Sequence, residues 1–334
     1  MLHAPVVSVI TPTRNRWTLL RETLQSLQTQ TLPAWEHIIV DDGSCDCTGE
    51  EIAALQQIDA RFRYLPRRGA TAGASACRNQ GLRAARSDLI VFLDSDDLLD
   101  PGCLERRVTV MQRNADLGFA VFLMAAFLQR RGDLDRKTST DILGDDLLGF
   151  LLFELPWVTP SAIWRRSALN QLGGWRETLL SWQDIDLHVR ALTAGIKYLK
   201  FPEIDCHVRW QYEPTKISVQ QRISPQHLQA TDHILSGFEQ LVNAGPGMTW
   251  SRQRALCSLY FFVAECWLQQ GRRREALAVW TRCRRRRLAP AGLYRIGSLL
   301  LLLQTPGSPL RTGVARLCHR WKGLCRLRSD PALI

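Results

Sequence analysis

The chain has 334 residues, of which 46% are hydrophobic and 22% charged, a composition typical of a folded globular protein. This balance excludes disordered, collagen-like and coiled-coil chains, and the length allows one large domain and one smaller one. The formal net charge of +11 is unevenly distributed, because residues 271–334 hold 15 Lys and Arg against two acidic residues whereas residues 1–270 are near neutral.

Strand-length and helix-length segments alternate through the first hundred residues, which is the pattern of βαβ units. The expected strands are 6–10, 37–40, 62–65 and 89–93, and the expected helices are 17–27, 50–57 and 74–85. The last of these strands is continuously apolar, as in a strand buried on both faces. The sequence therefore predicts an α/β fold with a mostly parallel central sheet flanked by helices.

The second half of the chain changes character. Residues 119–218 mix short strands with helices, and from about 225 onward only helical patterns remain. We expect a boundary at 219–225, giving a first domain of 1–222 and an all-helical domain of 223–334. Within 256–290 the spacing resembles one tetratricopeptide-like helix pair, which cannot bury its apolar face alone and is expected to pack on neighbouring helices.

Cysteine usage and the apolar runs indicate a compartment. The ten cysteines form no C-x-x-C pair, and Cys45 and Cys47 have the wrong spacing for a zinc knuckle or a redox site. No signal peptide is expected at the N-terminus. The apolar run 299–303 is far shorter than the ~20 residues of a spanning helix. We expect a cytoplasmic protein whose membrane contact is peripheral.

Polar segments follow three of the expected strands. They are Thr11–Arg16, Asp41–Ser44 and Asp94–Asp97. Ligands of open α/β sheets bind beyond the carboxyl ends of the strands, so these segments are expected to converge on one binding edge. The sequence contains no G-x-G-x-x-G fingerprint, no P-loop and no G-x-S-x-G elbow, which excludes the common dinucleotide, P-loop and hydrolase sites.

Carboxylates are the remaining chemical signal. Asp94 and Asp96 directly follow a buried strand, where their mutual repulsion is costly unless a cation neutralises it. Hard oxygen ligands suit Mg²⁺ or Mn²⁺ bridging to a diphosphate, so we expect this pair to bind metal. Asp97 and Asp100 are instead expected to form helix caps or turns.

Five motifs carry a resemblance to a known family. They are Val7–Arg16 (VSVITPTRNR), Ile39–Ser44 (IVDDGS), Ala76–Leu82 (ACRNQGL), Val91–Asp97 (VFLDSDD), and Gly173–Trp175 followed by Trp182–Leu187 (WQDIDL). In this order and spacing, over about residues 5–220, the chain resembles a family-2 glycosyltransferase with the GT-A nucleotide-diphospho-sugar-binding fold.

The resemblance implies a role for individual residues. Those implied in nucleotide binding are Thr11, Pro12, Arg14, Asp41 or its neighbour Asp42, Arg78 and Ser95. Asp94 and Asp96 would form the DxD-type metal motif, with Asp96 the direct ligand of Mn²⁺ or Mg²⁺, and Asp184 would be the catalytic base. Trp182, beside the proposed base, is expected to contact the acceptor, because sugar rings stack on aromatic faces.

Two positions depart from the family pattern. Gln183 stands where a Glu is frequent, which removes one charge but keeps Asp184. Gln211 and Glu213 stand where many members carry an Arg-x-His pair, so either Glu213 replaces the His as a metal ligand or the third ligand is missing. The Q-x-x-R-W motif of processive synthases is absent.

These features imply an inverting, metal-dependent, non-processive glycosyltransferase. It would move one sugar from a nucleotide-diphospho-sugar, by family default UDP-linked, to a hydroxyl of a glycan or lipid-linked acceptor, in cell-envelope polysaccharide or glycolipid synthesis. A nucleotidyltransferase would need a Gly-rich loop after the first strand, and Thr11–Arg16 contains no Gly. The other alternative is a scaffold protein that uses the helical region and carries a degenerate transferase domain.

The basic C-terminal segment suggests a further partner. Residues 310–328 place apolar residues on one stripe of a helix and basic residues around the rest, as in helices that bind an anionic membrane surface. No nucleic-acid-binding motif accompanies the charge, so nucleic acid is not an expected partner.

Overall fold

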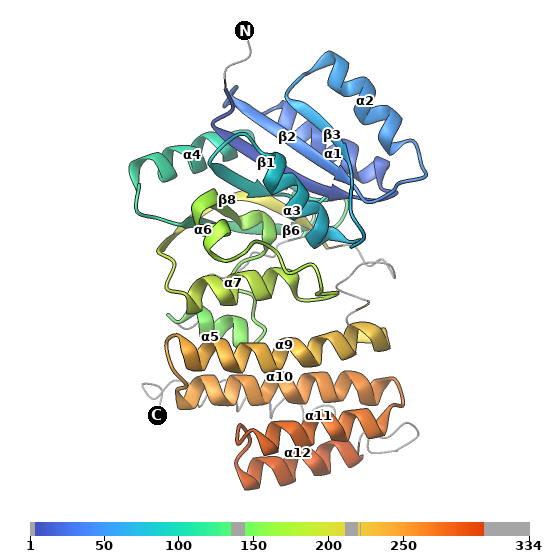
Figure 1. Cartoon of the computed structure of the whole chain (residues 1–334), viewed down its shortest axis with the longest axis vertical. Coiled ribbons are helices and arrows are strands. Elements are labelled where there is room, and N and C mark those ends of the chain that lie inside the picture. Colours follow the sequence, from blue (N-terminus) through green and yellow to red (C-terminus); the bar gives the residue numbers. More distant parts are fainter. Residues whose placement is uncertain (1–3, 135–143, 211–219, 221, 304–334) are drawn as a thin grey trace.

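A computed structural model describes residues 4–134, 144–210, 220 and 222–303, in which a layered sheet-and-helix region is followed by a stack of helices (Figure 1). The strands are β1 (Val7–Thr13), β2 (Trp35–Asp41), β3 (Phe62–Pro66), β4 (Leu89–Phe92), β5 (Leu98–Leu99), β6 (Phe119–Phe127), β7 (Ala162–Arg165) and β8 (Tyr198–Arg209). The helices are α1 (Trp17–Gln28), α2 (Thr48–Ile58), α3 (Ala74–Ala84), α4 (Cys103–Arg113), α5 (Asp146–Leu151), α6 (Arg166–Gln171), α7 (Gln183–Thr193), α9 (Pro225–Ala244), α10 (Trp250–Gln269), α11 (Arg273–Arg285) and α12 (Ala291–Leu303), with a short 3-10 turn at Thr159–Ser161.

The strands form one sheet in the order β3-β2-β1-β4-β7-β6-β8-β5. Its first half is parallel, since β1 pairs in parallel with β2 and β4, and β2 with β3. In the second half, β7 runs antiparallel to β4 and β6, and β5 runs antiparallel to β8. The sheet is therefore parallel over β1 to β4, where the sequence predicts βαβ units, and mixed in the later strands.

The first strand is longer than its apolar run. It pairs with β2 in register from Val7 opposite Trp35 to Thr13 opposite Asp41, so Thr11–Thr13 belong to the strand and not to the loop expected from the sequence. The helix α3 packs closely on this strand. A Cβ at Gly81 would lie 2.4 Å from a methyl carbon of Ile10, so the approach of α3 to β1 requires glycine there.

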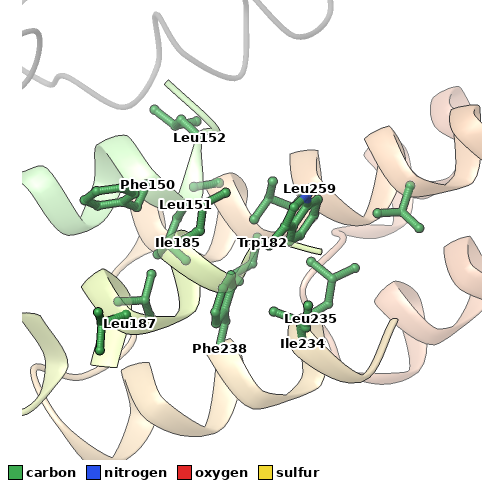
Figure 2. Packing of buried hydrophobic residues seen from close by; sticks show 14 of the residues in the cluster. Phe150, Leu151, Leu152, Trp182, Ile185, Leu187, Ile234, Leu235, Phe238 and Leu259 are labelled. Carbon is green, nitrogen blue, oxygen red and sulfur yellow. The ribbon is translucent and has the colours of Figure 1, made fainter. Parts of the chain in front are cut away.

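The C-terminal helices share a hydrophobic core with the sheet. One continuous cluster contains Ile10 and Ile38 of the sheet and also Trp280 and Leu301 of the helical stack. Figure 2 shows the middle of this cluster, where side chains of α5, α7, α9 and α10 meet. Because α7 lies between the sheet and α9 (Figure 1), the helical stack packs directly against the sheet-and-helix region.

The helix pair α10 and α11 is joined by a turn at Gly271, whose φ of 72° is readily adopted only by glycine. Tyr260, Val263, Trp280 and Cys283 are buried between these helices and their neighbours. In the part of the chain that the structure describes, no helix has the length and apolarity to cross a membrane. The segment 310–328 lies outside the described residues.

Candidate active site

The carboxyl ends of the first strands meet at one edge of the sheet, as their polar loops predicted. The Asp42 amide donates to the Thr13 carbonyl at 2.8 Å, and the Arg67 amide donates to the Asp41 carbonyl at 2.8 Å. The loops after β1 and β2 are also joined, because the Asn15 amide donates to Ser44 Oγ at 2.8 Å. The ends of β1, β2 and β3 therefore form one continuous rim.

Asp41 holds the shape of the loop after β2. Its Oδ1 accepts hydrogen bonds from the Ser44 amide at 2.9 Å and the Ser44 hydroxyl at 2.6 Å, while Tyr64 donates to Oδ2 at 2.8 Å. Burial and the Asp41 carboxylate together raise the pKa of Tyr64 to about 12, so this phenol stays protonated as a donor. The arrangement orients Asp41 at the strand end.

Asp42 organises the approach to α3. It forms an ion pair with Arg67, and its Oδ2 accepts from the Gly73 amide at 2.9 Å, immediately before α3 begins. Arg67 also donates to the carbonyl of Thr71 at 3.0 Å. Asp42 thereby fixes the loop before α3, the helix that carries Arg78.

Arg78, in α3, connects the predicted metal-binding segment after β4 with α7, the helix that carries the predicted base. It donates to Asp94 Oδ1 at 2.5 Å and to the Gln183 Oε1 at 3.4 Å. Its guanidinium lies 4.4 Å from the centre of the Trp175 ring, a cation–π contact that keeps the side chain buried. The residue thus fixes a positive charge between the end of β4 and the start of α7.

The acidic segment after β4 divides into two kinds of residue. The Asp94 side chain is 35% exposed, and that of Asp96 is 10% exposed and accepts from Arg16 at 3.4 Å. Asp97 accepts from the Arg209 amide at 3.1 Å, and Asp100 is 2.9 Å from His207 Nε2. The side chains of Asp97 and Asp100 thus contact β8 instead of capping a helix as the sequence predicted, since the N-cap of α4 is Gly102. Ser95, between the two predicted metal ligands, is buried.

Asp184 lies in the first turn of α7. Its Oδ1 accepts from the Ile185 amide at 2.9 Å. Burial raises the pKa of Asp184; the Asp94 charge adds to this shift and the Arg78 guanidinium opposes it. A carboxylate with a raised pKa holds a proton more strongly than an ordinary one, which suits a group that removes a proton.

The neighbouring Asp186 has a different environment. It is fully buried and bonded to Arg176 and Arg190, each at 2.8 Å. Both of its oxygens are therefore committed to ion pairs inside the protein. Of the two acidic residues in this turn, Asp184 is the one that faces the Arg78 and Asp94 charges.

Asp94 and Asp96 are the residues that would hold a divalent cation. Within the described ranges, no three His, Cys, Asp or Glu side chains are grouped as a metal site. Mg²⁺ commonly binds through one or two carboxylates together with substrate phosphates, and Asp94 and Asp96 are such a pair of hard oxygen donors. Glu213, the third predicted ligand, lies outside the described residues.

Two of the predicted contacts are not supported by the placement of the residues. Thr11 is fully buried with its hydroxyl 2.8 Å from His37 Nε2, because β1 continues past it, so its side chain does not line a pocket. Trp182 is 4% exposed and packs in the core shown in Figure 2, so its ring is not open to an acceptor sugar. Pro12 is half-buried and Arg14 is exposed on the rim.

Three residues of the site were not selected from the sequence. Arg16 contacts Asp96, Tyr64 contacts Asp41, and Arg67 contacts Asp42. The sequence does carry a signal for Arg67, because this residue directly follows β3 and ligands of open α/β sheets bind at strand ends. Tyr64 lies within β3 and offers no comparable signal.

Comparison with known proteins agrees with this geometry. Residues 8–173 match the family described as Glycosyl transferase family 2. A Campylobacter jejuni protein, GalNAc(5)-diNAcBac-PP-undecaprenol beta-1,3-glucosyltransferase, is 35% identical over 135 residues, covering 40% of this chain and 42% of the relative. A Bacillus subtilis protein named as the teichuronic acid biosynthesis glycosyltransferase TuaG is 36% identical over 125 residues, covering 36% of this chain and 48% of the relative. The chain therefore spans less than half the length of these curated relatives.

Solved structures share the fold over nearly the whole chain. Staphylococcus aureus TarS residues 1–349 superimpose with a TM-score of 0.60 at 15% identity, covering 97% of this chain and 92% of the other. The mannosyltransferase PcManGT from Pyrobaculum calidifontis, in complex with GDP-Man and Mn²⁺, has a TM-score of 0.56 at 16% identity, covering 98% and 87%. These neighbours confirm the expected GT-A fold followed by a helical region.

Proposed function

Because the chain belongs to glycosyl transferase family 2, we propose that it is an inverting, metal-dependent glycosyltransferase that moves one sugar from a nucleotide-diphospho-sugar to an acceptor hydroxyl. The observation that carries the proposal is the position of Arg78. It bonds to Asp94 at 2.5 Å and contacts Gln183 at 3.4 Å, next to Asp184. The Arg78 guanidinium thereby links the proposed donor site to the segment that carries the proposed catalytic base.

The donor would bind along the rim formed by the ends of β1, β2 and β3 and against the adjacent segment after β4, which Arg16 joins to β1 through Asp96. Asp41, whose carboxylate also accepts from Ser44 and Tyr64, would accept a further hydrogen bond from the nucleobase. The exposed Arg14 and half-buried Pro12 border the same rim. Arg78 would contact the diphosphate together with the buried segment at Ser95. A uridine nucleotide is the proposed donor; a solved neighbour, TarS, is recorded in complex with UDP-GlcNAc, whereas PcManGT is recorded with GDP-Man.

The chemistry needs one proton acceptor and a stabilised leaving group. As the acceptor oxygen bonds to the anomeric carbon, the bond from that carbon to the diphosphate breaks, and the acceptor proton passes to Asp184. The raised pKa of Asp184 favours this transfer. Charge that develops on the departing nucleoside diphosphate would be stabilised by the Arg78 guanidinium. A divalent cation held by Asp94 and Asp96 would neutralise further negative charge on the diphosphate.

The acceptor is proposed to be a glycan or lipid-linked hydroxyl in cell-envelope polysaccharide or glycolipid synthesis. The names of two relatives support this class, since one name includes PP-undecaprenol and the other includes teichuronic acid biosynthesis. Transfer of a single sugar is proposed, because the processive Q-x-x-R-W motif is absent from the sequence.

A peripheral position on the cytoplasmic face of a membrane is part of the proposal. Ile296, Leu299 and Leu302 are 50%, 55% and 41% exposed on α12, at helical spacing on one side. Residues 271–303 carry nine Arg against the single acidic Glu275. Exposed apolar residues with an excess of cations match an anionic lipid surface, where each cation contributes about 1 kcal/mol.

The deciding experiment measures donor turnover and single-sugar transfer. A panel of nucleotide sugars is incubated with Mn²⁺, and released nucleoside diphosphate is quantified for the wild type and for Asp184→Asn. We expect turnover of at least one donor and a loss of roughly 10²-fold or more in Asp184→Asn with donor binding retained. No turnover of any donor, or equal transfer by the variant, would contradict the proposal.

A further inference from the structure

The residue that precedes the proposed base has an unusual backbone. Trp182 occupies the N-cap position of α7 with φ 57° and ψ 29°, in the left-handed region. Bulky residues avoid this conformation because of steric contact at Cβ, and they adopt it only where surrounding packing holds them. The side chain of Trp182 makes no cap hydrogen bond to the helix. Packing elsewhere must therefore hold the start of α7.

That packing comes from the C-terminal helices. The Trp182 ring lies 5.1 Å from the ring of Phe153, and Phe153 lies 5.4 Å from Phe262 of α10. These three rings form an aromatic row, Trp182–Phe153–Phe262. Phe153 also has a positive φ, of 60°, so two residues with strained backbones contact each other in this row. Figure 2 shows Trp182 beside Leu259, which also belongs to α10.

A second contact holds the residue before Trp182. Ser181 is fully buried, and its hydroxyl is 2.6 Å from Nδ1 of His227 in the first turn of α9. The chain entering α7 is therefore attached to α9 through Ser181 and to α10 through Trp182 and Phe153. Neither attachment includes a residue of the donor rim.

We propose that Trp182 is a positioning residue, and that α10, acting through Phe262 and Phe153, sets the orientation of Asp184. The assignment rests on the proposed function, because it takes Asp184 as the base. The helix stack then has a catalytic purpose beyond burial, since it fixes the first turn of α7 relative to the donor. The base must be aligned for proton transfer, and a small displacement is costly to the rate.

This arrangement separates two kinetic effects. Arg78 and Asp94, the proposed donor contacts, belong to α3 and the end of β4. Arg78 contacts α7 through Gln183 at 3.4 Å, but its ion pair with Asp94 at 2.5 Å and its packing on Trp175 hold it without that contact. Loosening the row at Phe262 should therefore lower kcat and leave donor affinity unchanged. Loss of overall stability would instead reduce the amount of folded enzyme without altering the rate of the folded fraction.

The chain offers a matched pair for the test. Phe262 is partly buried and stacks on Phe153, whereas the adjacent Phe261 is fully buried and lies 5.4 Å from Trp280 of α11, away from α7. The variants Phe262→Ala, Phe262→Tyr and Phe261→Ala are compared by melting temperature, by UDP and Mn²⁺ calorimetry, and by kcat per folded molecule. Hydrogen exchange is followed at residues 182–187.

We expect Phe262→Ala to lower kcat by about 10-fold or more and to speed exchange at 182–187, with UDP affinity unchanged. Phe262→Tyr keeps the stacked ring and should retain kcat. Phe261→Ala should lose more thermal stability but keep kcat and the exchange rate at 182–187. Equal effects of Phe262→Ala and Phe261→Ala on kcat and exchange, or none from Phe262→Ala, would overturn the inference.

The exchange measurement separates this inference from the proposed function. If the wild type turns over no donor but Phe262→Ala still speeds exchange at 182–187, the proposed function fails while the coupling of α10 to α7 stands. If the wild type is active and Phe262→Ala matches it in both measurements, the coupling fails and the proposed function stands.

Discussion

Arg78 and Asp94 form an ion pair of 2.5 Å in which the two partners differ in exposure. The Arg78 side chain is 7% exposed and that of Asp94 is 35% exposed. The arginine is therefore held by the protein, on Trp175 and beside Gln183, while the carboxylate borders solvent at the end of β4. A diphosphate arriving at this rim would meet a fixed cation next to a carboxylate that can share a metal.

Replacing Arg78 should weaken donor binding. In Arg78→Gln we expect the affinity for a nucleoside diphosphate to fall by about 10-fold or more, since a charge-assisted hydrogen bond contributes ~1.5–3 kcal/mol. Arg83→Gln, which removes an exposed arginine from the last turn of the same helix, is the control and should bind normally. Calorimetry with UDP and Mn²⁺ measures both, and equal affinities would remove Arg78 from the donor site.

Removing Asp96 should abolish the metal dependence of nucleotide binding. The variant Asp96→Ala leaves the cation without its main protein ligand, so added Mn²⁺ should no longer raise UDP affinity. Asp116→Ala is the matched control, because Asp116 is 65% exposed and pairs with Lys197 away from the rim. If Mn²⁺ still strengthens UDP binding in Asp96→Ala, the metal ligands lie elsewhere.

Asp184→Asn should stabilise the protein at neutral pH. The pKa of Asp184 is raised in the folded state, so its contribution to folding is present below its unfolded pKa, ~3.9, and is lost as pH rises through the folded value. The uncharged Asn avoids this loss. We therefore expect a higher melting temperature than the wild type at pH 7, with the difference vanishing at acidic pH.

Asp186→Asn, two residues along α7, should have the opposite effect. It breaks a buried pair with Arg190 and Arg176, a change that costs roughly 3–5 kcal/mol where an opposite charge is left buried. Thermal denaturation across pH compares the two variants. A lower melting temperature for Asp184→Asn at pH 7 would contradict the burial argument for Asp184.

Binding to anionic vesicles should depend on the C-terminal end. We expect the full chain to sediment with anionic but not with neutral vesicles, less so at high salt, and to lose this binding on truncation after Thr305. The triple change of Ile296, Leu299 and Leu302 to Gln tests the exposed face of α12 separately. Equal sedimentation of the truncated and full chains would assign residues 306–334 no part in membrane binding.

Local patterns were sufficient for the first half of the fold. The buried run 89–93 and the alternation before it located β1 to β4 and the helices between them, because hydrophobic period and strand length are properties of short segments. The same logic placed Asp94, Asp96 and Asp41 at strand ends. Asp184 came from its motif, which no local pattern of apolar residues would have singled out.

Only the tertiary structure decided which side each of these residues faces. Thr11 is in the core because β1 pairs with β2 beyond the apolar run of β1. That pairing depends on a distant segment, since Val7 lies opposite Trp35, 28 residues later in the chain. The sequence predicted that Trp182 contacts the acceptor, but its ring is buried against Phe153 and α10. The sequence around a tryptophan beside a catalytic base is the same whether the ring faces the substrate or the core. Residue type and order are written in the chain, but burial depends on contacts between distant segments, and these exist only once the helical stack has packed against α7.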